Sequence, residues 1–395
     1  MEQQTPNANR LHILLIGRRN SGKSSLINAL TGQEVSVVSP VAGTTTDPVN
    51  KAMEVHPLGA CLFIDTPGVD DAGELGELRV AQTLKALKRA DIALFLCETG
   101  DDWEREWADR IRELNIPLVP VLNKIDIRTD LDALVARIET LFGTRPVQVS
   151  ALQRTGMEAV FQAILEKLPE DFGAQSITGT LVDEGDCVLL VMPQDIQAPK
   201  GRLILPQVQT IRELLDKKCT VVSCTTDRLQ ATLRVLAQPP KLIITDSQVF
   251  PVVYQQKPEG SLLTSFSVLF AAYKGDIAYF VAGAKAIGSL TEQSRVLIAE
   301  ACAHAPLTED IGRVKIPRLL RKRVGEQLSI DFVAGRDFPS DLSAYDLVIH
   351  CGACMFNRKY VLNRVASARR QQVPMTNYGV AIACLTGILD KIVYQ

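Results

Sequence analysis

The chain has 395 residues, of which 46% are hydrophobic and 22% are charged, and its formal net charge is −2. This length predicts two or three domains, and the composition excludes an intrinsically disordered protein. The near-neutral charge argues against a general binder of nucleic acid or of anionic membranes, and no apolar run approaches the ~18 residues of a membrane span.

Nine cysteines, an odd number, are spread over the chain. We expect thiols kept for packing or metal binding in a reducing compartment, which places the protein in the cytoplasm. Residues 1–10 lack the charged-then-apolar order of a signal peptide and are expected to form a flexible N-terminal tail. His12 and His56 lie near the edges of predicted strands and are expected to be ordinary surface or edge residues.

Apolar strand-like runs alternate with helical stretches from residue 11 to residue 170, beginning with "LHILLIG" and "KSSLINALTG". This alternation predicts an α/β domain with a mostly parallel sheet. A linker starting at Pro169 precedes a smaller α/β domain, residues 178–258, without a catalytic motif. A third α/β domain, residues 260–395, contains a Cys/His cluster that follows the helix-like "EQSRVLIAEA". No internal repeat is evident.

The stretch "GRRNSGKS", Gly17 to Ser24, matches the GxxxxGK[ST] phosphate loop between a predicted strand and a predicted helix. The backbone N–H groups of such a loop surround the β-phosphate. Lys23 would reach the β- and γ-phosphates, and Ser24 would bind magnesium. Further GTP contacts are expected from Gly17, Asn20, Ser21, Gly22 and Ser25.

The segments "AGTTTDP" and "DTPG" supply the expected magnesium and γ-phosphate contacts. Asp65 would hold magnesium through water, and the N–H of Gly68 would meet the γ-phosphate. Thr45 is the favoured threonine to bind magnesium when the γ-phosphate is present, and its two threonine neighbours remain alternatives. Val69 follows where many GTPases carry a Gln that orients the attacking water, so hydrolysis by this domain alone should be slow.

The segments "NKID" and "SA" follow two later predicted strands and would hold the base. The carboxylate of Asp126 can accept the N1–H and 2-amino protons of guanine, which adenine lacks. Asn123 and Lys124 belong to the same motif, and Ser150 with Ala151 can close over the base. Four motifs in this order, each after a strand, predict a domain that binds GTP and GDP.

This series of motifs resembles the translation-factor-related GTPases of the Era and tRNA-modifying type. In the potassium-activated members of that group, an Asn in the phosphate loop helps to hold a K⁺ ion that acts as an arginine finger does. Asn20 falls at that position. The resemblance therefore implies potassium stimulation, and the alternative is an Asn that only shapes the loop.

Two short motifs near the C-terminus contain metal-ligating residue types. "HCGAC" contains His350, Cys351 and Cys354, and "ACAHAP" upstream contains Cys302 and His304. The CxxC spacing lets two thiolates reach one metal centre, and spacing alone fits zinc and iron–sulfur equally well. A redox dithiol formed by the two cysteines of "HCGAC" is a further alternative, which would not need the upstream motif.

An Era-like GTPase domain, a middle domain without motifs and a CxH…HCxxC signature together resemble the FeFe-hydrogenase maturation GTPases, the HydF family. The segment "PMTNYGVAIA" is also similar to that family. The resemblance implies a 4Fe–4S cluster held by Cys302, Cys351 and Cys354, with His304 or His350 as a fourth or exchangeable ligand. It further implies dimerisation through the middle domain, receipt of a two-iron subcluster precursor made with two radical-SAM maturases, and its delivery to apo-FeFe-hydrogenase.

The alternative function follows from a closed zinc site of Cys302, His304, Cys351 and Cys354. Zinc would make the third domain structural and the protein a GTPase switch in tRNA modification or ribosome assembly. The neutral charge and the lack of a basic surface with stacked aromatics weaken that reading. One basic stretch, "RVKIPRLLRKR", is expected to be a solvated helix face or a docking surface for an acidic partner.

Overall fold

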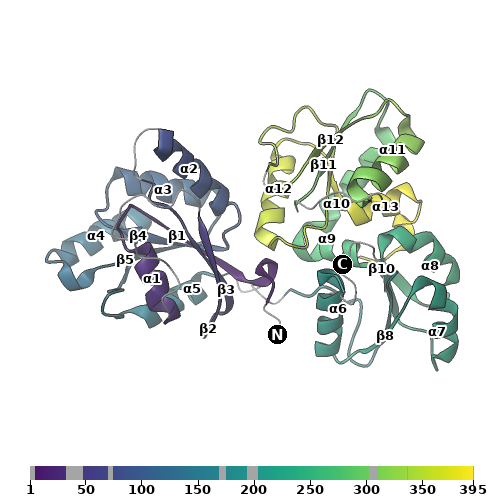
Figure 1. Ribbon diagram of the computed structural model, residues 1–395, viewed down its shortest axis with the longest axis horizontal. Coiled ribbons are helices and arrows are strands. Elements are labelled where there is room, and N and C mark those ends of the chain that lie inside the picture. The colour runs from purple at the N-terminus through teal and green to yellow at the C-terminus, as the bar shows by residue number, and fades with distance from the viewer. Residues whose placement is uncertain are drawn as a thin grey trace. The chain divides into compact units, whose positions relative to one another are not determined.

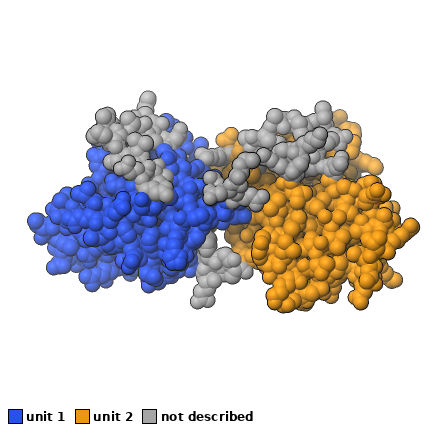
Figure 2. Space-filling model, turned by 60° about the horizontal axis from the view of Figure 1, so that its bottom comes forward, with its two compact units in different colours: residues 1–172 blue, residues 173–395 orange. Residues whose placement is uncertain are grey.

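The computed structural model describes residues 5–32, 48–69, 74–168, 175–193, 203–301, 310–335 and 337–394. The chain divides into two compact units, residues 1–172 and 173–395, coloured separately in Figure 2. The described residues form one sheet in the first unit and two in the second, with helices between the strands, so the expected α/β class is confirmed. Within these ranges no helix has the length and apolar character needed to cross a membrane.

The first unit is built around a six-stranded sheet, which Figure 1 shows with its helices. Its strands are β1 (Leu11–Gly17), β2 (Val49–Val55), β3 (Gly59–Asp65), β4 (Ile92–Cys97), β5 (Leu118–Leu122) and β6 (Val147–Gln148). Its helices are α1 (Lys23–Thr31), α2 (Glu74–Leu87), α3 (Asp102–Glu113), α4 (Leu131–Phe142) and α5 (Met157–Lys167). The strand order is β2-β3-β1-β4-β5-β6, and all neighbours are parallel except β2 and β3.

Strand β1 lies inside this sheet and is buried along its whole length. Leu14 and Ile16 enter a core with residues of α2, α3 and α4, whereas Ile13 and Leu15 enter a core with α1 and α5. Helices therefore cover both faces, which explains why the strand is a continuous apolar run instead of an alternating one.

His12 is buried at the start of β1, so the expectation of a surface position is wrong, whereas His56 is exposed. Nδ1 of His12 lies 3.1 Å from the carbonyl oxygen of Arg89, and Nε2 lies 2.8 Å from that of Asn7. Burial lowers the pKa of His12 to about 4, so the ring is neutral near pH 7. A neutral ring that donates to a backbone oxygen can be buried at little cost.

The second unit contains two four-stranded parallel sheets. The first sheet and its helices comprise β7 (Cys187–Val191), α6 (Leu205–Asp216), β8 (Thr220–Cys224), α7 (Leu229–Val235), β9 (Leu242–Thr245), α8 (Phe250–Gln256), β10 (Leu262–Ser265) and α9 (Phe266–Lys274). The second comprises α10 (Ile277–Lys285), β11 (Arg295–Ala299), α11 (Ile316–Val324), β12 (Ser329–Val333), β13 (Leu347–His350), α12 (Arg358–Arg370), β14 (Met375–Asn377) and α13 (Tyr378–Leu385). Because β10 pairs with β9, the first sheet continues past residue 258.

Both sheets of the second unit repeat one topology, although no repeat is evident in the sequence. Their strand orders are β8-β7-β9-β10 and β12-β11-β13-β14. In each sheet the second strand is added on one side of the first and the third strand on the other side, which makes a topological switch point between the first and third strands. Open α/β sheets bind ligands at such switch points, beyond the carboxyl ends of the strands. The segment "EQSRVLIAEA", which was expected to be helical, contains strand β11. Its residues 296–299 are fully buried inside the sheet, which explains why the run is continuously apolar.

Gly283 of α10 tests the packing of this sheet. A Cβ at Gly283 would collide with the backbone of Met375 in β14, whereas a Cβ at Gly288 would meet nothing within 4 Å. We expect Gly283→Ala to destabilise the second unit by about 1–3 kcal/mol and Gly288→Ala to leave its stability unchanged. All seven Tyr lie in residues 173–395 and both Trp in residues 1–172, so near-UV circular dichroism of Tyr follows this unit and Trp fluorescence follows the other. Equal unfolding midpoints for the two variants would contradict the close packing of Gly283 against Met375.

Candidate nucleotide site and metal site

The phosphate loop joins β1 to α1 and curls around its own lysine. The Nζ of Lys23 donates hydrogen bonds to the carbonyl oxygens of Gly17 at 3.0 Å and Arg18 at 2.7 Å. Gly22 has a φ of 93°, and a Cβ there would collide with the side chain of Asn123. Glycine is therefore required where the loop turns into the helix. The same segment holds the other predicted phosphate contacts, Asn20, Ser21 and Ser25.

The predicted magnesium ligands lie beside this loop. The Oγ of Ser24 donates a 2.6 Å hydrogen bond to Oδ2 of Asp65. Burial raises the pKa of Asp65, and the Ser24 hydrogen bond lowers it. A Cβ at Gly68 would lie 2.7 Å from the Cα of Arg19, so the "DTPG" segment contacts the phosphate loop. Thr45, the predicted mobile ligand, lies outside the described residues.

Asn123 connects three of the predicted nucleotide motifs. Its Oδ1 accepts hydrogen bonds from the backbone N–H of Lys124 at 2.8 Å and of Ala151 at 3.0 Å. Its Nδ2 donates to the carbonyl oxygen of Ser21 at 3.2 Å. The Nζ of Lys124 donates to the carbonyl oxygen of Asn20 at 2.5 Å. The base-reading segment and the phosphate loop are thus fixed to one another at the carboxyl ends of the strands.

Asp126 and Ser150 lie in the two predicted base-binding segments of the same site, and Ser150 is fully buried. Asp126 lies in the 3-10 helix η2 (Ile125–Ile127), is partly exposed and makes no hydrogen bond or ion pair within the described ranges. Its carboxylate therefore remains available to a guanine base. The Oγ of Ser150 accepts a 3.1 Å hydrogen bond from the N–H of Gln153, which shapes the loop that follows β6.

The cysteines of "HCGAC" lie in the loop between β13 and α12. The Sγ of Cys351 accepts hydrogen bonds from the backbone N–H of Ala301 at 3.0 Å and of Ala353 at 3.4 Å. Burial raises the pKa of the Cys351 thiol, and these two N–H groups lower it. Cys354, three residues on, is partly exposed, and its neighbour Met355 is 61% exposed. The middle of the loop, at Cys354 and Met355, therefore reaches the surface, whereas Ala353 and Asn357 on either side are buried.

Lys274, at the end of α9, was missed by the sequence analysis. Its side chain is 2% exposed, and its Nζ donates to the carbonyl oxygens of Ala353 at 3.1 Å, Cys354 at 3.1 Å and Phe356 at 2.8 Å. A buried ammonium group that satisfies three carbonyl oxygens fixes the cysteine loop. The only sequence signal is a Lys inside the apolar stretch "SVLFAAYKG", which did not indicate this partner.

His350 is buried and uses both ring nitrogens. Nη1 of Arg364 lies 2.8 Å from its Nε2, and Nδ1 lies 2.6 Å from the carbonyl oxygen of Cys351. Because a guanidinium group only donates, Nε2 is the acceptor and Nδ1 carries the proton. Burial, followed by the charge of Arg364, lowers the pKa of His350 to about 3. A metal bond from Nε2 would therefore require Arg364 to move away.

Arg364 was also missed by the sequence analysis, and both of its terminal nitrogens make hydrogen bonds. Its Nη2 donates 2.6 Å hydrogen bonds to the carbonyl oxygen of Gly335 and to the hydroxyl of Tyr360. Its guanidinium group lies 4.7 Å from the ring centroid of Phe338 and 4.5 Å from that of Tyr360. These contacts oppose the displacement that would free His350.

Cys302 and His304, the upstream half of the predicted metal set, lie outside the described residues. Across the part of the chain that the structure describes, no three His, Cys, Asp or Glu residues are grouped to hold a metal ion. Ala301 nevertheless directly precedes Cys302, and its N–H donates to the Sγ of Cys351. The chain enters the undescribed segment beside the first cysteine of "HCGAC".

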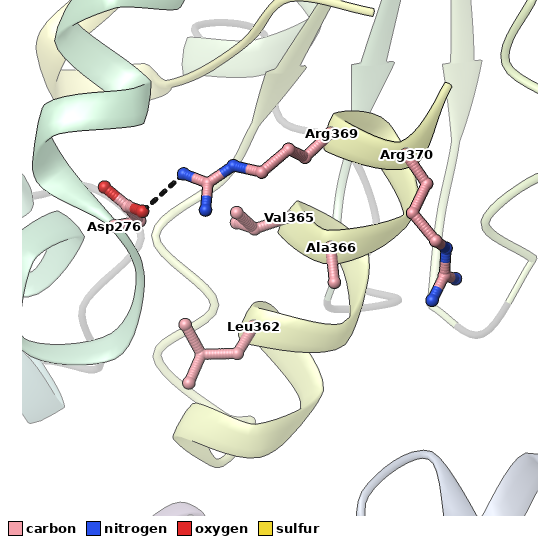
Figure 3. A pocket seen from close by; sticks show the side chains of 6 residues that line it. All are labelled: Asp276, Leu362, Val365, Ala366, Arg369 and Arg370. Atoms are coloured by element: carbon pink, nitrogen blue, oxygen red, sulfur yellow. Dashed lines mark hydrogen bonds and ion pairs between the residues drawn. The ribbon is translucent and has the colours of Figure 1, made fainter. Parts of the chain in front are cut away.

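An open cavity of about 370 Å³ lies along α12, away from the predicted site residues. Figure 3 shows Leu362, Val365 and Ala366 along one side of the helix, with Arg369 reaching Asp276. That ion pair measures 2.6 Å. The cavity contains none of the predicted nucleotide or metal ligands.

Three domain families match successive parts of the chain. The family described as "50S ribosome-binding GTPase" matches residues 12–124. The families described as "Hydrogen maturase F dimerization domain" and "Hydrogen maturase F tetramerization domain" match residues 177–275 and 278–395, which together exceed half of the chain. The first unit is thus a P-loop GTPase domain of a kind that binds GTP or GDP with magnesium, and the two later domains support self-association.

Curated relatives cover the GTPase domain. "GTPase Era" of Aquifex aeolicus is 31% identical over 40% of this chain and 57% of its own length. "tRNA modification GTPase MnmE" of Paraburkholderia xenovorans is 34% identical over 42% of this chain and 36% of its own length. This chain therefore spans about half or less of these relatives. A crystal structure of Aquifex aeolicus Era bound to GDP.AlF4- has 22% identity and a TM-score of 0.37, covering 57% of this chain and 98% of that one.

Asp126→Asn tests the base-reading assignment. We expect GTP affinity to fall by about 10- to 100-fold, since each hydrogen bond from a base to a charged group contributes about 1.5–3 kcal/mol. Affinity for xanthosine triphosphate should rise, because an amide can donate to the 2-oxo group while accepting from N1–H. Calorimetric titration of both nucleotides with the wild type and the variant provides the measurement. Unchanged preference for GTP in the variant would contradict the role of this carboxylate.

Proposed function

Because the chain belongs to the hydrogen maturase F family and carries a GTPase domain, we propose that it is a GTP-hydrolysing scaffold for metal-cluster assembly. Its cargo would be the two-iron subcluster precursor of the FeFe-hydrogenase active site. Two radical-SAM maturases would take part in making that precursor, and apo-FeFe-hydrogenase would receive it. The free thiols that this role requires suit a reducing compartment such as the cytoplasm.

One observation carries this proposal: the Sγ of Cys351 accepts a hydrogen bond from Ala301, the residue before Cys302. Strands β11 and β13 are parallel neighbours at the switch point of their sheet, and the two cysteine motifs follow their carboxyl ends. We infer that Cys302, Cys351 and Cys354 converge there on one metal centre. The GTPase domain alone would fit many switch proteins, but this convergence favours a metal scaffold.

Of the three thiolates proposed to hold a 4Fe–4S cluster, those of Cys351 and Cys354 lie in the described part of the chain. Backbone N–H groups that donate to Cys351 favour its thiolate form, as at iron–sulfur sites. Iron without a protein thiolate would supply an exchangeable coordination position for the cargo. The partly exposed Cys354 and the exposed Met355 place the middle of the loop within reach of a partner.

We propose His304, in preference to His350, as the fourth ligand. Both ring nitrogens of His350 are engaged, Nε2 by Arg364, so His350 is better suited to holding the cysteine loop. His304 keeps the role of exchangeable ligand in this proposal. The zinc alternative, with His304 and the three cysteines, would fit the same loop and is distinguished by metal and sulfide content.

In the GTPase domain, we assign phosphate binding to Lys23 and magnesium binding to Ser24, Asp65 and Thr45. Gly68 would contact the γ-phosphate. Val69 follows Gly68 and is 4% exposed. Because valine has no amide to orient the attacking water, GTP hydrolysis should be slow.

Potassium would act in place of an arginine finger by binding near Asn20. Asn20 is exposed, and its φ of 59° lies in the left-handed region. We expect GTP turnover to be several-fold faster in KCl than in NaCl at equal ionic strength, since a cation beside the transferred phosphoryl group replaces the arginine finger. Asn20→Ala should remove the difference without changing GDP affinity. Equal turnover of the wild type in the two salts would refute the potassium site.

Cys354→Ser tests the scaffold function, with Cys187→Ser of β7 as a matched thiol removal outside the site. Both variants are purified without oxygen, assayed for iron and then incubated with the maturases and apo-hydrogenase. We expect Cys354→Ser to lose most of its iron and the ability to activate hydrogenase, and Cys187→Ser to keep both. Normal activation by Cys354→Ser would sink the proposed docking of cargo at this loop.

A further inference from the structure

Lys274 ends helix α9 and contacts the cysteine loop, by which we mean residues 351–357. The lysine is 2% exposed, and its Nζ donates to the carbonyl oxygens of Ala353 at 3.1 Å, Cys354 at 3.1 Å and Phe356 at 2.8 Å. Three acceptors around one nitrogen match the three protons of an ammonium group, whereas a neutral amine would supply only two. The geometry therefore indicates a charged lysine beside the loop.

Helix α9 stabilises this buried charge without cancelling it. Burial of an ammonium group is costly unless its protons are hydrogen-bonded, and the three carbonyl oxygens of the loop meet that need. Lys274 also lies in the last turn of α9, where the partial negative charge of the helix end favours a cation. A carbonyl group, unlike a carboxylate, has no net charge. These contacts therefore do not neutralise the ammonium group that lies beside Cys354.

The contact between α9 and the cysteine loop is reciprocal. Arg358, the first residue of α12, donates from Nη1 to the carbonyl oxygen of Tyr273 at 2.8 Å and to that of Gly275 at 3.4 Å. Helix α9 belongs to the part of the chain matched by the dimerization family, residues 177–275, and the loop belongs to the part matched by the tetramerization family, residues 278–395. The position of the loop therefore depends on both domains.

Ala353 shows why the loop needs support. Its φ of 48° lies in the left-handed region, which is unfavourable for a residue with a Cβ. In this conformation its N–H donates to the Sγ of Cys351 at 3.4 Å, while its carbonyl oxygen accepts from Lys274 at 3.1 Å. Lys274 thus holds a strained residue in the conformation that directs its N–H at a proposed metal ligand.

A lysine can also bind backbone oxygens only to close a turn, and Lys257 does so in the same unit. Its Nζ donates to the carbonyl oxygens of Pro258 at 3.1 Å, Glu259 at 3.2 Å and Ser261 at 2.8 Å. Lys257 is partly exposed and lies within four residues of these partners. Lys274 is instead buried and reaches oxygens that are 79 to 82 residues away in the sequence. The comparison separates local turn closure from the placing of a charge beside the cysteines.

We propose that Lys274 is a positioning residue of the metal centre and that its charge raises the reduction potential of a cluster bound by the cysteine loop. This inference rests on the proposed function, in which that cluster contains four irons. Addition of an electron to such a cluster adds one negative charge, which a nearby cation stabilises. The buried surroundings of Lys274 strengthen this effect, because a medium of low dielectric constant screens charges weakly.

The test compares Lys274→Met and Lys274→Gln with the matched control Lys257→Met. Methionine removes the charge and all three hydrogen bonds, whereas glutamine removes the charge but keeps two donors. Each protein is purified without oxygen, and near-UV circular dichroism of Tyr shows whether the second unit is folded. The measurements are iron and sulfide per chain, the rate of iron release to a ferrous chelator, and the reduction midpoint from a dithionite titration followed by electron paramagnetic resonance.

We expect Lys274→Met to release iron roughly tenfold faster than the wild type, because the loop loses its support. Lys274→Gln should keep most of its iron but be reduced with an equilibrium constant roughly tenfold smaller, which is about 59 mV for a one-electron couple. A variant that only loosened the structure would release iron without this shift to lower potential. Lys257→Met should match the wild type in both measurements. The glutamine variant carries the test if the methionine variant does not fold.

Three results would contradict the inference. Iron release and midpoints equal to the wild type in both Lys274 variants would overturn it while leaving the proposed cluster intact. An unchanged midpoint in a Lys274→Gln protein that keeps its iron would overturn the role of the charge. Wild-type protein with zinc and no sulfide would overturn the proposed cluster, and the inference with it.

Discussion

Parallel pairing of β11 with β13 is the constraint on which the metal site depends. The register places Ala299 beside His350, so the chain leaves both strands at the same edge, and the N–H of Cys351 donates to the carbonyl oxygen of Ala299 at 3.0 Å. Ala301 can then donate to the Sγ of Cys351. The loop that follows is rigid because a buried ammonium group, that of Lys274, satisfies three of its carbonyl oxygens. The fold itself thereby brings two segments that are far apart in the sequence to one place.

The nucleotide site also forms where segments leave parallel strands at the same edge of a sheet. The first sheet of the second unit has such an edge as well, but none of the predicted sites lies there. In the first unit, the phosphate loop follows β1 and the base-reading segment follows β5, with β4 between these two parallel strands, and the two segments are joined through Asn123. The first sheet of the second unit has the same strand order as the second, but its carboxyl edge is packed instead of open. There Ser247, Ser265 and Ser267 bond to one another, and a Cβ at Gly379 of α13 would collide with Ser267. A switch point becomes a binding site only where the neighbouring elements leave it accessible.

The motifs were predictable from sequence because each is local: the phosphate loop and "HCGAC" both fit within ten residues. The α/β class followed from the alternation of apolar runs and is confirmed. Strand β11 was expected as a helix, since a short buried apolar run has no periodicity that separates the two. Lys274 and Arg364 escaped prediction because their roles depend on contacts made only in three dimensions, 79 residues from Ala353 in the case of Lys274. Burial of His12 likewise depends on a carbonyl oxygen from another element.

The central claim is that the cysteine motifs hold an iron–sulfur cluster. The measurement that tests it most directly is iron, zinc and acid-labile sulfide per chain in protein purified without oxygen, followed by electron paramagnetic resonance after dithionite reduction. We expect about four irons with matching sulfide and a paramagnetic signal of a reduced cluster. Stoichiometric zinc without sulfide would contradict it, and would make "HCGAC" part of a structural site in a GTPase switch.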